Sequence, residues 1–148
     1  MVPSGFMTGA RTDINRTLST TGRREYAVAM TVSVALADDN LIVREGIAQL
    51  LAGQHDIEVV ASCDDLDSLL EAIEERHPEV VVTDIRMPPT HSDEGIRLAA
   101  LLRERHPEVG VVVLSNYAEA GFATALLESG SEGRAYLLKE RVHSRTQL

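Results

Sequence analysis

Carboxylate side chains follow short apolar runs at two points in this 148-residue sequence. Asp38 and Asp39 come directly after the run TVSVALA, and Asp84 comes after the run EVVVT. Carboxylates that converge repel one another and raise their pKa values, and a divalent cation removes that repulsion. Mg²⁺ takes oxygen ligands and commonly keeps several of its waters. The three aspartates therefore predict an acidic Mg²⁺ pocket, provided that the fold brings them together.

A hydroxyl group and a single cation follow two further apolar runs. Ser115 comes after VVVL, and Lys139, the only lysine in the chain, comes after AYLL. Beside an Mg²⁺ site they offer a hydrogen-bond donor and a compact positive charge, a role that the planar fork of arginine fits poorly. Phosphoryl transfer depends chiefly on positioning and charge neutralisation, and an aspartate can carry the phosphoryl group covalently. The set therefore suits a phosphoryl group held on a carboxylate.

Apolar runs rich in β-branched residues alternate with segments whose apolar residues recur at helical spacing. The expected strands comprise residues 31–37, 57–63, 79–84, 109–116 and 133–139. The expected helices comprise residues 40–53, 64–77, 94–106 and 118–130. This alternation predicts an α/β fold, with a doubly wound, five-stranded parallel sheet as the middle of three α-β-α layers. Ligands of such folds bind at the carboxyl ends of the strands, where the polar side chains above would meet.

The connections between these elements also have readable signals. Residues 85–95, IRMPPTHSDEG, predict a loop because two adjacent prolines break regular structure. We expect His91 in this loop to be a solvated residue and not a ligand. The near-repeat ERHPEV at 75–80 and 104–109 predicts two copies of one helix-to-strand connection. We do not expect its histidines to bind zinc.

Composition excludes several classes of function. The net charge is −9, and residues 30–148 carry ten basic against 21 acidic side chains, so the general field of the chain does not favour nucleic acid. No apolar run approaches the roughly 18 residues of a membrane span. The single cysteine, Cys63, excludes an internal disulfide, suits a reducing compartment and is expected to fill the core. We therefore expect a cytoplasmic protein that binds neither membranes nor nucleic acid directly.

Residues 1–29 differ from the rest of the chain. They show no helical or strand periodicity and are rich in Thr, Ser, Gly and Arg, which favours disorder. We expect a disordered or non-native N-terminal extension, with Met30 as a candidate for the true first residue. Residues 30–148 are expected to form one domain.

Residues 32–139 resemble the receiver domain of bacterial two-component response regulators. The acidic pair follows the first expected strand, the later aspartate the third, the hydroxyl the fourth and the lysine the fifth, which is the order of that family. The segments LADDNLIVREGIAQLL, VVVTDIRMP and AYLLKE resemble its NarL/LuxR-type subfamily. The resemblance implies the flavodoxin-like receiver fold and a signalling phosphoacceptor instead of an enzyme.

The resemblance also implies roles for individual residues. Asp84 would accept the phosphoryl group. Mg²⁺ would be bound by Asp38, Asp39 and Asp84 together with the backbone carbonyl of Arg86. Lys139 would pair with the phosphoryl group.

Three further residues would complete the site and its switch. Ser115 would hydrogen-bond the phosphoryl group, and Thr83 would line the site. Tyr136 stands where the family has its rotating switch aromatic, although a buried strand tyrosine is the alternative interpretation. The contacts to the phosphoryl group would shift the population of conformations toward an active arrangement.

The resemblance names partners and also a departure. Receivers take the phosphoryl group from a sensor histidine kinase, and the NarL/LuxR type regulates transcription through a helix-turn-helix domain after a fifth receiver helix. ERVHSRTQL, after Lys139, has no helical stripe and is too short for a stable helix. We therefore expect the fifth helix to be largely missing, no DNA-binding domain, lower stability, and a homodimer or a heterodimer with another response regulator.

Other classes of function remain to be compared. Phosphohydrolases that use an aspartyl phosphate have a second aspartate two residues after the nucleophile, where this chain has Arg86. A nucleotide-binding α/β protein would have a Gly-rich loop after its first strand, where this chain has LADDN. A truncated interaction module that is not phosphorylated, acting as a decoy or dimerisation partner of an intact regulator, remains the main alternative.

Overall fold

The computed structural model describes residues 12–18, 24–142 and 148. Within these ranges the strands are β1 (Thr12–Leu18), β2 (Arg24–Met30), β3 (Val32–Ala37), β4 (Ile57–Cys63), β5 (Val80–Asp84), β6 (Gly110–Ser115) and β7 (Arg134–Leu138). The α-helices are α1 (Leu41–Ala52), α2 (Leu66–Arg76), α3 (Glu94–Arg105) and α4 (Ala120–Leu127), and a 3₁₀ turn covers Lys139–Arg141.

The five predicted strands form one sheet in the order β4-β3-β5-β6-β7. Each pairs with its neighbours in parallel, and helices connect successive strands. Most side chains of the apolar VVV runs in the central strands are buried because helices lie on both faces of the sheet. The predicted α/β fold with a doubly wound parallel sheet is therefore confirmed, with most element ends within a few residues of the expected positions.

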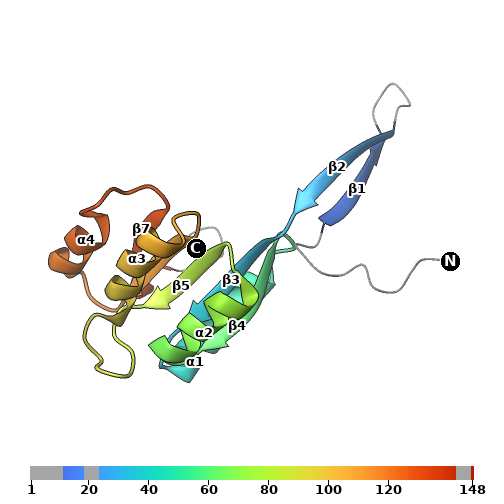
Figure 1. Ribbon diagram of the computed structural model, residues 1–148. Helices are drawn as coiled ribbons and strands as arrows, with labels where there is room; N and C mark the ends of the chain where they lie inside the picture. The colour runs from blue at the N-terminus through green and yellow to red at the C-terminus, as the bar shows by residue number, and fades with distance from the viewer. Residues whose placement is uncertain (1–11, 19–23, 143–147) are drawn as a thin grey trace.

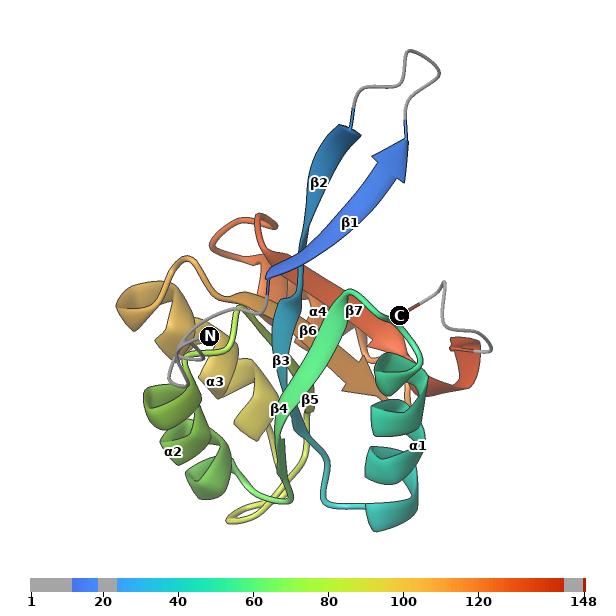
Figure 2. The same cartoon turned by 90° about the vertical axis from the view of Figure 1, so that its right-hand side faces the viewer.

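The helices lie in two layers. Figure 2 shows α1 on one side of the sheet and α2 and α3 on the other. The α1 side buries Ile47 and Leu51 against β3 and β6, whereas the other side buries Leu69 of α2, Leu98 of α3 and Leu126 of α4 against the opposite face. These two apolar layers hold the strand ends at fixed positions, which is what a site at that edge requires.

Local signals set the helix boundaries. The side chain of Asn40 accepts a hydrogen bond from the third residue of α1, and that of Asp65 accepts one at the start of α2, as expected of N-caps. The two copies of ERHPEV end α2 and α3, with His77 and His106 as the residues after each helix. Cys63 is buried in the core as predicted, and its burial raises the pKa of the thiol.

The N-terminal extension differs from the prediction. β1 and β2 pair as an antiparallel ribbon, in which Thr12 lies opposite Met30, and Figure 1 shows it projecting away from the sheet. The sequences TDINRTL and REYAVAM contain β-branched and aromatic residues that favour strands, and this local preference was missed because neither segment alternates clearly. The other residues of 1–29 lie outside the described part of the chain.

The α1 face of β6 and β7 is only partly covered. No α-helix follows β7 in the described part of the chain, and residues 143–147 lie outside it. On this face of the two strands, Val112 and Leu137 are half-buried. The reason is that Ile47 of α1 and the terminal Leu148 belong to the same apolar cluster. Lower stability and dimerisation remain predictions.

Candidate functional site

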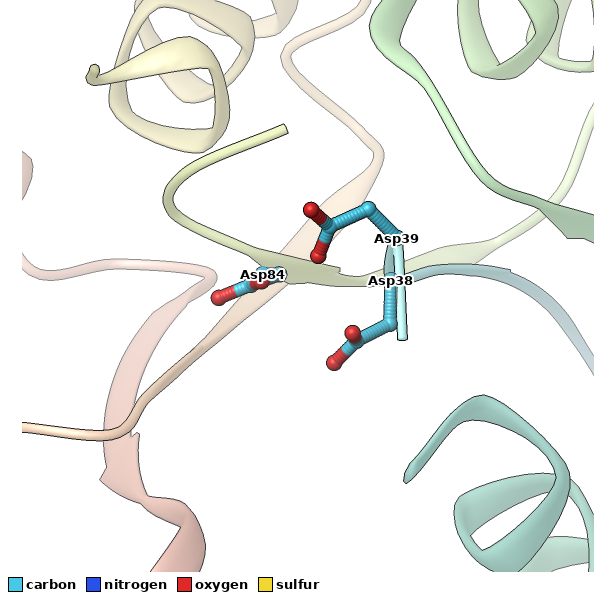
Figure 3. A group of neighbouring side chains, drawn as sticks. All are labelled: Asp38, Asp39 and Asp84. Atoms are coloured by element: carbon cyan, nitrogen blue, oxygen red, sulfur yellow. The ribbon is translucent and has the colours of Figure 1, made fainter. Parts of the chain in front are cut away.

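Three carboxylates meet at the carboxyl edge of the sheet. Asp38 and Asp39 follow β3, and Asp84 ends β5, which pairs with β3 in register at Ala37 and Thr83. One oxygen from each carboxylate lies within 4.8 Å of the others, and Figure 3 shows the three side chains at these neighbouring strand ends. The parallel pairing therefore produces the convergence that the sequence predicted.

Lys139 joins two of these carboxylates. Its Nζ atom lies 2.6 Å from Oδ2 of Asp38 and 3.4 Å from Oδ1 of Asp84. The lysine follows β7, two strands away from β5, and its side chain is only 12% exposed. Asp38 is buried, and its backbone carbonyl accepts a hydrogen bond from Arg44 of α1. The single lysine is thus a fixed cation within the acidic cluster.

The electrostatics of Asp84 suit a metal cation. Burial raises the pKa of this carboxyl above its ordinary value; the charge of Lys139 lowers it, and that of Asp38 raises it again. A raised pKa means that the site disfavours its own negative charge, which a bound divalent cation would relieve. The donors are all carboxylate oxygens, the ligand type that Mg²⁺ prefers. The residues present therefore fit Mg²⁺.

Two hydroxyl groups converge on one carbonyl beside the site. The buried hydroxyl of Ser115 donates to the backbone oxygen of Tyr117 at 2.8 Å, and the hydroxyl of Tyr136 donates to the same oxygen at 3.1 Å. Tyr136 is half-buried in β7 and packs against the core. The ring of Tyr136 is therefore partly buried and held by a hydrogen bond. Its hydroxyl and that of Ser115 share the Tyr117 carbonyl as acceptor.

The structure corrects the prediction for Thr83 and adds a contact for Arg86. Thr83 does not line the pocket. It is fully buried on the α2 and α3 side, and its hydroxyl donates to the carbonyl oxygen of Asp84, because successive strand side chains point to opposite faces. The guanidinium of Arg86 reaches Glu119, at the start of α4. The proposed role of the Arg86 carbonyl as a metal ligand remains a prediction.

His91 lies beside the acidic cluster and lines the same pocket. Its side chain is 57% exposed, in keeping with a loop residue, but its Nε2 atom lies 3.4 Å from Oδ2 of Asp39. The backbone of His91 is left-handed, and its N–H donates to the carbonyl of Met87. Its neighbours Thr90 and Ser92 both donate backbone N–H groups to the buried carboxylate of Glu94. Hydrogen bonds among its own residues and to Glu94 therefore fix the loop that borders the site.

Comparison with known proteins agrees with this arrangement. Residues 34–145 match the family model described as the response regulator receiver domain. The chain belongs to this receiver family. Among the described residues, no helix of the receiver is both long and apolar enough to cross a bilayer.

Curated relatives of the receiver are regulatory proteins. The chain is 35% identical over 109 residues to the transcriptional regulatory protein DegU of Brevibacillus brevis, a match that covers 74% of this chain and 44% of DegU. It is 32% identical over 108 residues to the oxygen regulatory protein NreC of Staphylococcus haemolyticus, covering 73% and 48%. The chain thus spans about half the length of the curated relatives it matches.

Solved structures show the same fold. The signal receiver domain of the response regulator designated NarL from Mycobacterium tuberculosis matches with a TM-score of 0.68 and 30% identity, covering 78% of this chain and 88% of that one. A LuxR-family DNA-binding response regulator from Staphylococcus aureus matches with a TM-score of 0.64 and 31% identity, covering 74% and 88%. The predicted NarL/LuxR-type receiver fold is confirmed.

Sequence reasoning missed two acidic residues of the receiver. Glu94 was placed at the start of a helix, but nothing predicted that its carboxylate turns back into the preceding loop and is fully buried. Glu119 was placed near a helix start, without a partner. Thr90 and Ser92, close before Glu94, are the kind of donor that could have signalled the first contact. No local signal links Glu119 to Arg86, because they are 33 residues apart.

The buried Glu94 makes stability depend on pH. Burial raises its pKa, but hydrogen bonds from Thr90 and Ser92 lower it more, from 4.5 to about 2. The stabilisation is therefore complete above about pH 4.5 and is lost as the pH falls toward 2. We expect Glu94→Gln to lower the free energy of unfolding by up to about 3 kcal/mol at pH 7. Urea unfolding at pH 7, 5 and 3 should show this difference shrinking at pH 3.

The exposed Glu104 of α3 provides the control for this prediction. Glu104→Gln should change the free energy of unfolding by less than about 0.5 kcal/mol at each pH. A constant difference between Glu94→Gln and the wild type from pH 7 to pH 3 would contradict the role of the Glu94 charge.

Proposed function

We propose that this receiver accepts a phosphoryl group on Asp84 from the phosphohistidine of a sensor histidine kinase. One observation carries the proposal: three carboxylates converge within 4.8 Å, and the single lysine contacts two of them. The three carboxylates can bind a divalent cation, and this cation and Lys139 together can hold a phosphoryl group. We further propose a cytoplasmic protein whose whole-length relatives suggest a role in regulating transcription.

The proposed chemistry uses the side chains at the strand ends. Oδ1 of Asp84 accepts the N–H of Ile85 and faces Lys139, so we assign Oδ2 as the attacking oxygen. A bond forms between that oxygen and phosphorus while the bond from phosphorus to the histidine nitrogen breaks, and the nitrogen keeps the electron pair. Mg²⁺, held by Asp38, Asp39 and Asp84, would supply charge neutralisation for the transferred group. Lys139 would supply a second positive charge.

The structure suggests how this change is passed on. The Ser115 hydroxyl is bonded to Tyr117 before phosphorylation. If the Ser115 hydroxyl turned toward a phosphoryl group, the Tyr117 carbonyl would lose that hydrogen bond. It would keep only the hydrogen bond from the Tyr136 hydroxyl. The segment that leads into α4 would then have a different set of hydrogen bonds, which biases its conformational population. The proposed output is a changed surface for a partner, such as a second receiver.

Incubation with acetyl phosphate and Mg²⁺, followed by intact mass measurement, tests the proposal. We expect a gain of one phosphoryl group, with acetate as the leaving group, and no gain when EDTA removes Mg²⁺. Asp84→Asn should abolish the gain. This variant should melt no lower than the wild type, because burial penalises the charged form of Asp84.

The result also decides between the two functions. If folded wild-type protein gains no mass, phosphoacceptor activity is wrong for this chain and the interaction module that is not phosphorylated is favoured. If Asp84→Asn gains as much mass as the wild type, the acceptor has been assigned to the wrong residue.

A further inference from the structure

Arg86 forms a bridge between two segments that line the pocket of the site. Its Nη2 atom donates to both carboxylate oxygens of Glu119, at 2.8 and 3.0 Å, and its guanidinium carbon lies 5.5 Å from the centre of the Phe122 ring. Arg86 follows β5, whereas Glu119 and Phe122 belong to the start of α4. The bridge therefore ties the loop after the proposed phosphoacceptor to the helix after Ser115.

The bridge lies in the same pocket as the proposed chemistry. Arg86, Glu119 and Phe122 line that pocket together with Asp84 and Ser115. A guanidinium presents several N–H donors in a planar fork that matches phosphoryl oxygens. Arg86 is thus a cation within the pocket whose present partner is a carboxylate and not a phosphoryl group.

The Arg86–Glu119 pair is suited to exchange. The two side chains are 47% and 34% exposed, and ion pairs in such positions contribute only about 0–1 kcal/mol. Phosphorylation of Asp84 would place additional negative charge in the pocket that Arg86 lines. A doubly charged phosphoryl group would therefore compete effectively with the single charge of Glu119 for the guanidinium.

We propose that Arg86 is a second binding group for the phosphoryl group, and that Glu119 competes with it for the guanidinium. This inference rests on the proposed function of Asp84. In the free receiver Arg86 is held by Glu119. In the phosphorylated receiver the guanidinium turns to the phosphoryl oxygens, and the residue before the first turn of α4 loses its ion pair. Arg86 thereby links occupancy of the site to the N-terminus of α4.

Competition predicts opposite effects for the two halves of the pair. The probe is beryllofluoride with Mg²⁺, a phosphoryl mimic, and its affinity is measured by calorimetry and by fluorine NMR. We expect Arg86→Gln to weaken binding about 5–10-fold, because it removes a charged donor. We expect Glu119→Gln to strengthen binding about 3-fold, because it releases the guanidinium. A bridge with only a structural role would instead weaken binding and lower the melting temperature in both variants.

The double variant separates competition from simple charge repulsion. If Glu119 acts through Arg86, Arg86→Gln combined with Glu119→Gln should bind like Arg86→Gln alone. If the gain from Glu119→Gln persists without Arg86, Glu119 acts through its own field and the competition is wrong. Glu104→Gln and Arg105→Gln, exposed at the far end of α3, are matched controls for the same changes in net charge and should bind like the wild type.

Failure of this inference is distinguishable from failure of the proposed function. Suppose that Arg86→Gln and Glu119→Gln bind beryllofluoride with the same affinity as the wild type and both control variants. Arg86 is then not a phosphoryl-binding group, and the proposed function of Asp84 stands. If the folded wild type neither binds the probe nor gains a phosphoryl group from acetyl phosphate, the proposed function itself fails.

Discussion

Replacing Gly95 by alanine is expected to lower the free energy of unfolding by about 3 kcal/mol, and the melting temperature by roughly 10 °C. A Cβ atom on Gly95 would lie 2.2 Å from the carbonyl oxygen of Asp84 and 3.0 Å from Cα of Ile85. Both obstacles are backbone atoms, and the N–H of Gly95 is bonded to the carbonyl of Ile85 at 2.8 Å. The start of α3 and the end of β5 therefore cannot separate without breaking this hydrogen bond or displacing the end of β5. Thermal and urea unfolding measure the loss.

Gly46 provides the matched control for this substitution. It lies within α1, and nothing stands within 4 Å of the position of its Cβ. Gly46→Ala should stabilise the receiver by about 0.5–1 kcal/mol, because alanine favours a helix more than glycine does. The two variants should therefore have effects of opposite sign. Equal effects would show that the close approach at Gly95 does not constrain the Asp84 strand end.

Lys139→Ala is expected to lower the rate of phosphorylation by acetyl phosphate about 100-fold, since it removes a preorganised charge from the transferred group. It should also destabilise the fold by roughly 3 kcal/mol at neutral pH, because it leaves the buried Asp38 and Asp84 carboxylates without their cation. Saturating Mg²⁺ should reduce the second effect, because it supplies replacement charge. Mass spectrometry against time and urea unfolding with and without Mg²⁺ measure the two effects.

Two further variants test whether position or charge matters at Lys139. Lys139→Arg keeps the charge but replaces a compact ammonium by a planar fork, so we expect it to restore more of the stability than of the rate. Arg141→Ala, which removes an exposed cation two residues later, should change neither. If Lys139→Ala phosphorylates at the wild-type rate, the lysine is a structural counter-ion and not part of the phosphoryl site.

The fold was predictable from the sequence because its signals are local and repeated. The apolar β-branched runs of the central strands are mostly buried, each helix has one apolar stripe, and ERHPEV marks the same connection twice. The paired strands β1 and β2 were missed because their apolar residues do not alternate clearly, although their β-branched and aromatic residues favour strands. An isolated two-stranded ribbon also has only marginal stability, because it buries no apolar face, so its sequence needs no pattern of buried residues.

Five site residues could be found from the sequence alone, because each stands at the carboxyl end of a strand and parallel strands bring these ends to one edge: Asp38, Asp39, Asp84, Ser115 and Lys139. The sequence thus determined which groups meet. Only the tertiary structure decided how they pair: that Lys139 contacts Asp38 more closely than Asp84, that Thr83 turns away from the pocket, and that Arg86 is held by Glu119. These outcomes depend on side-chain rotamers and on distances between segments far apart in the chain. No local pattern encodes them, because the packing of the helices against the sheet determines them jointly.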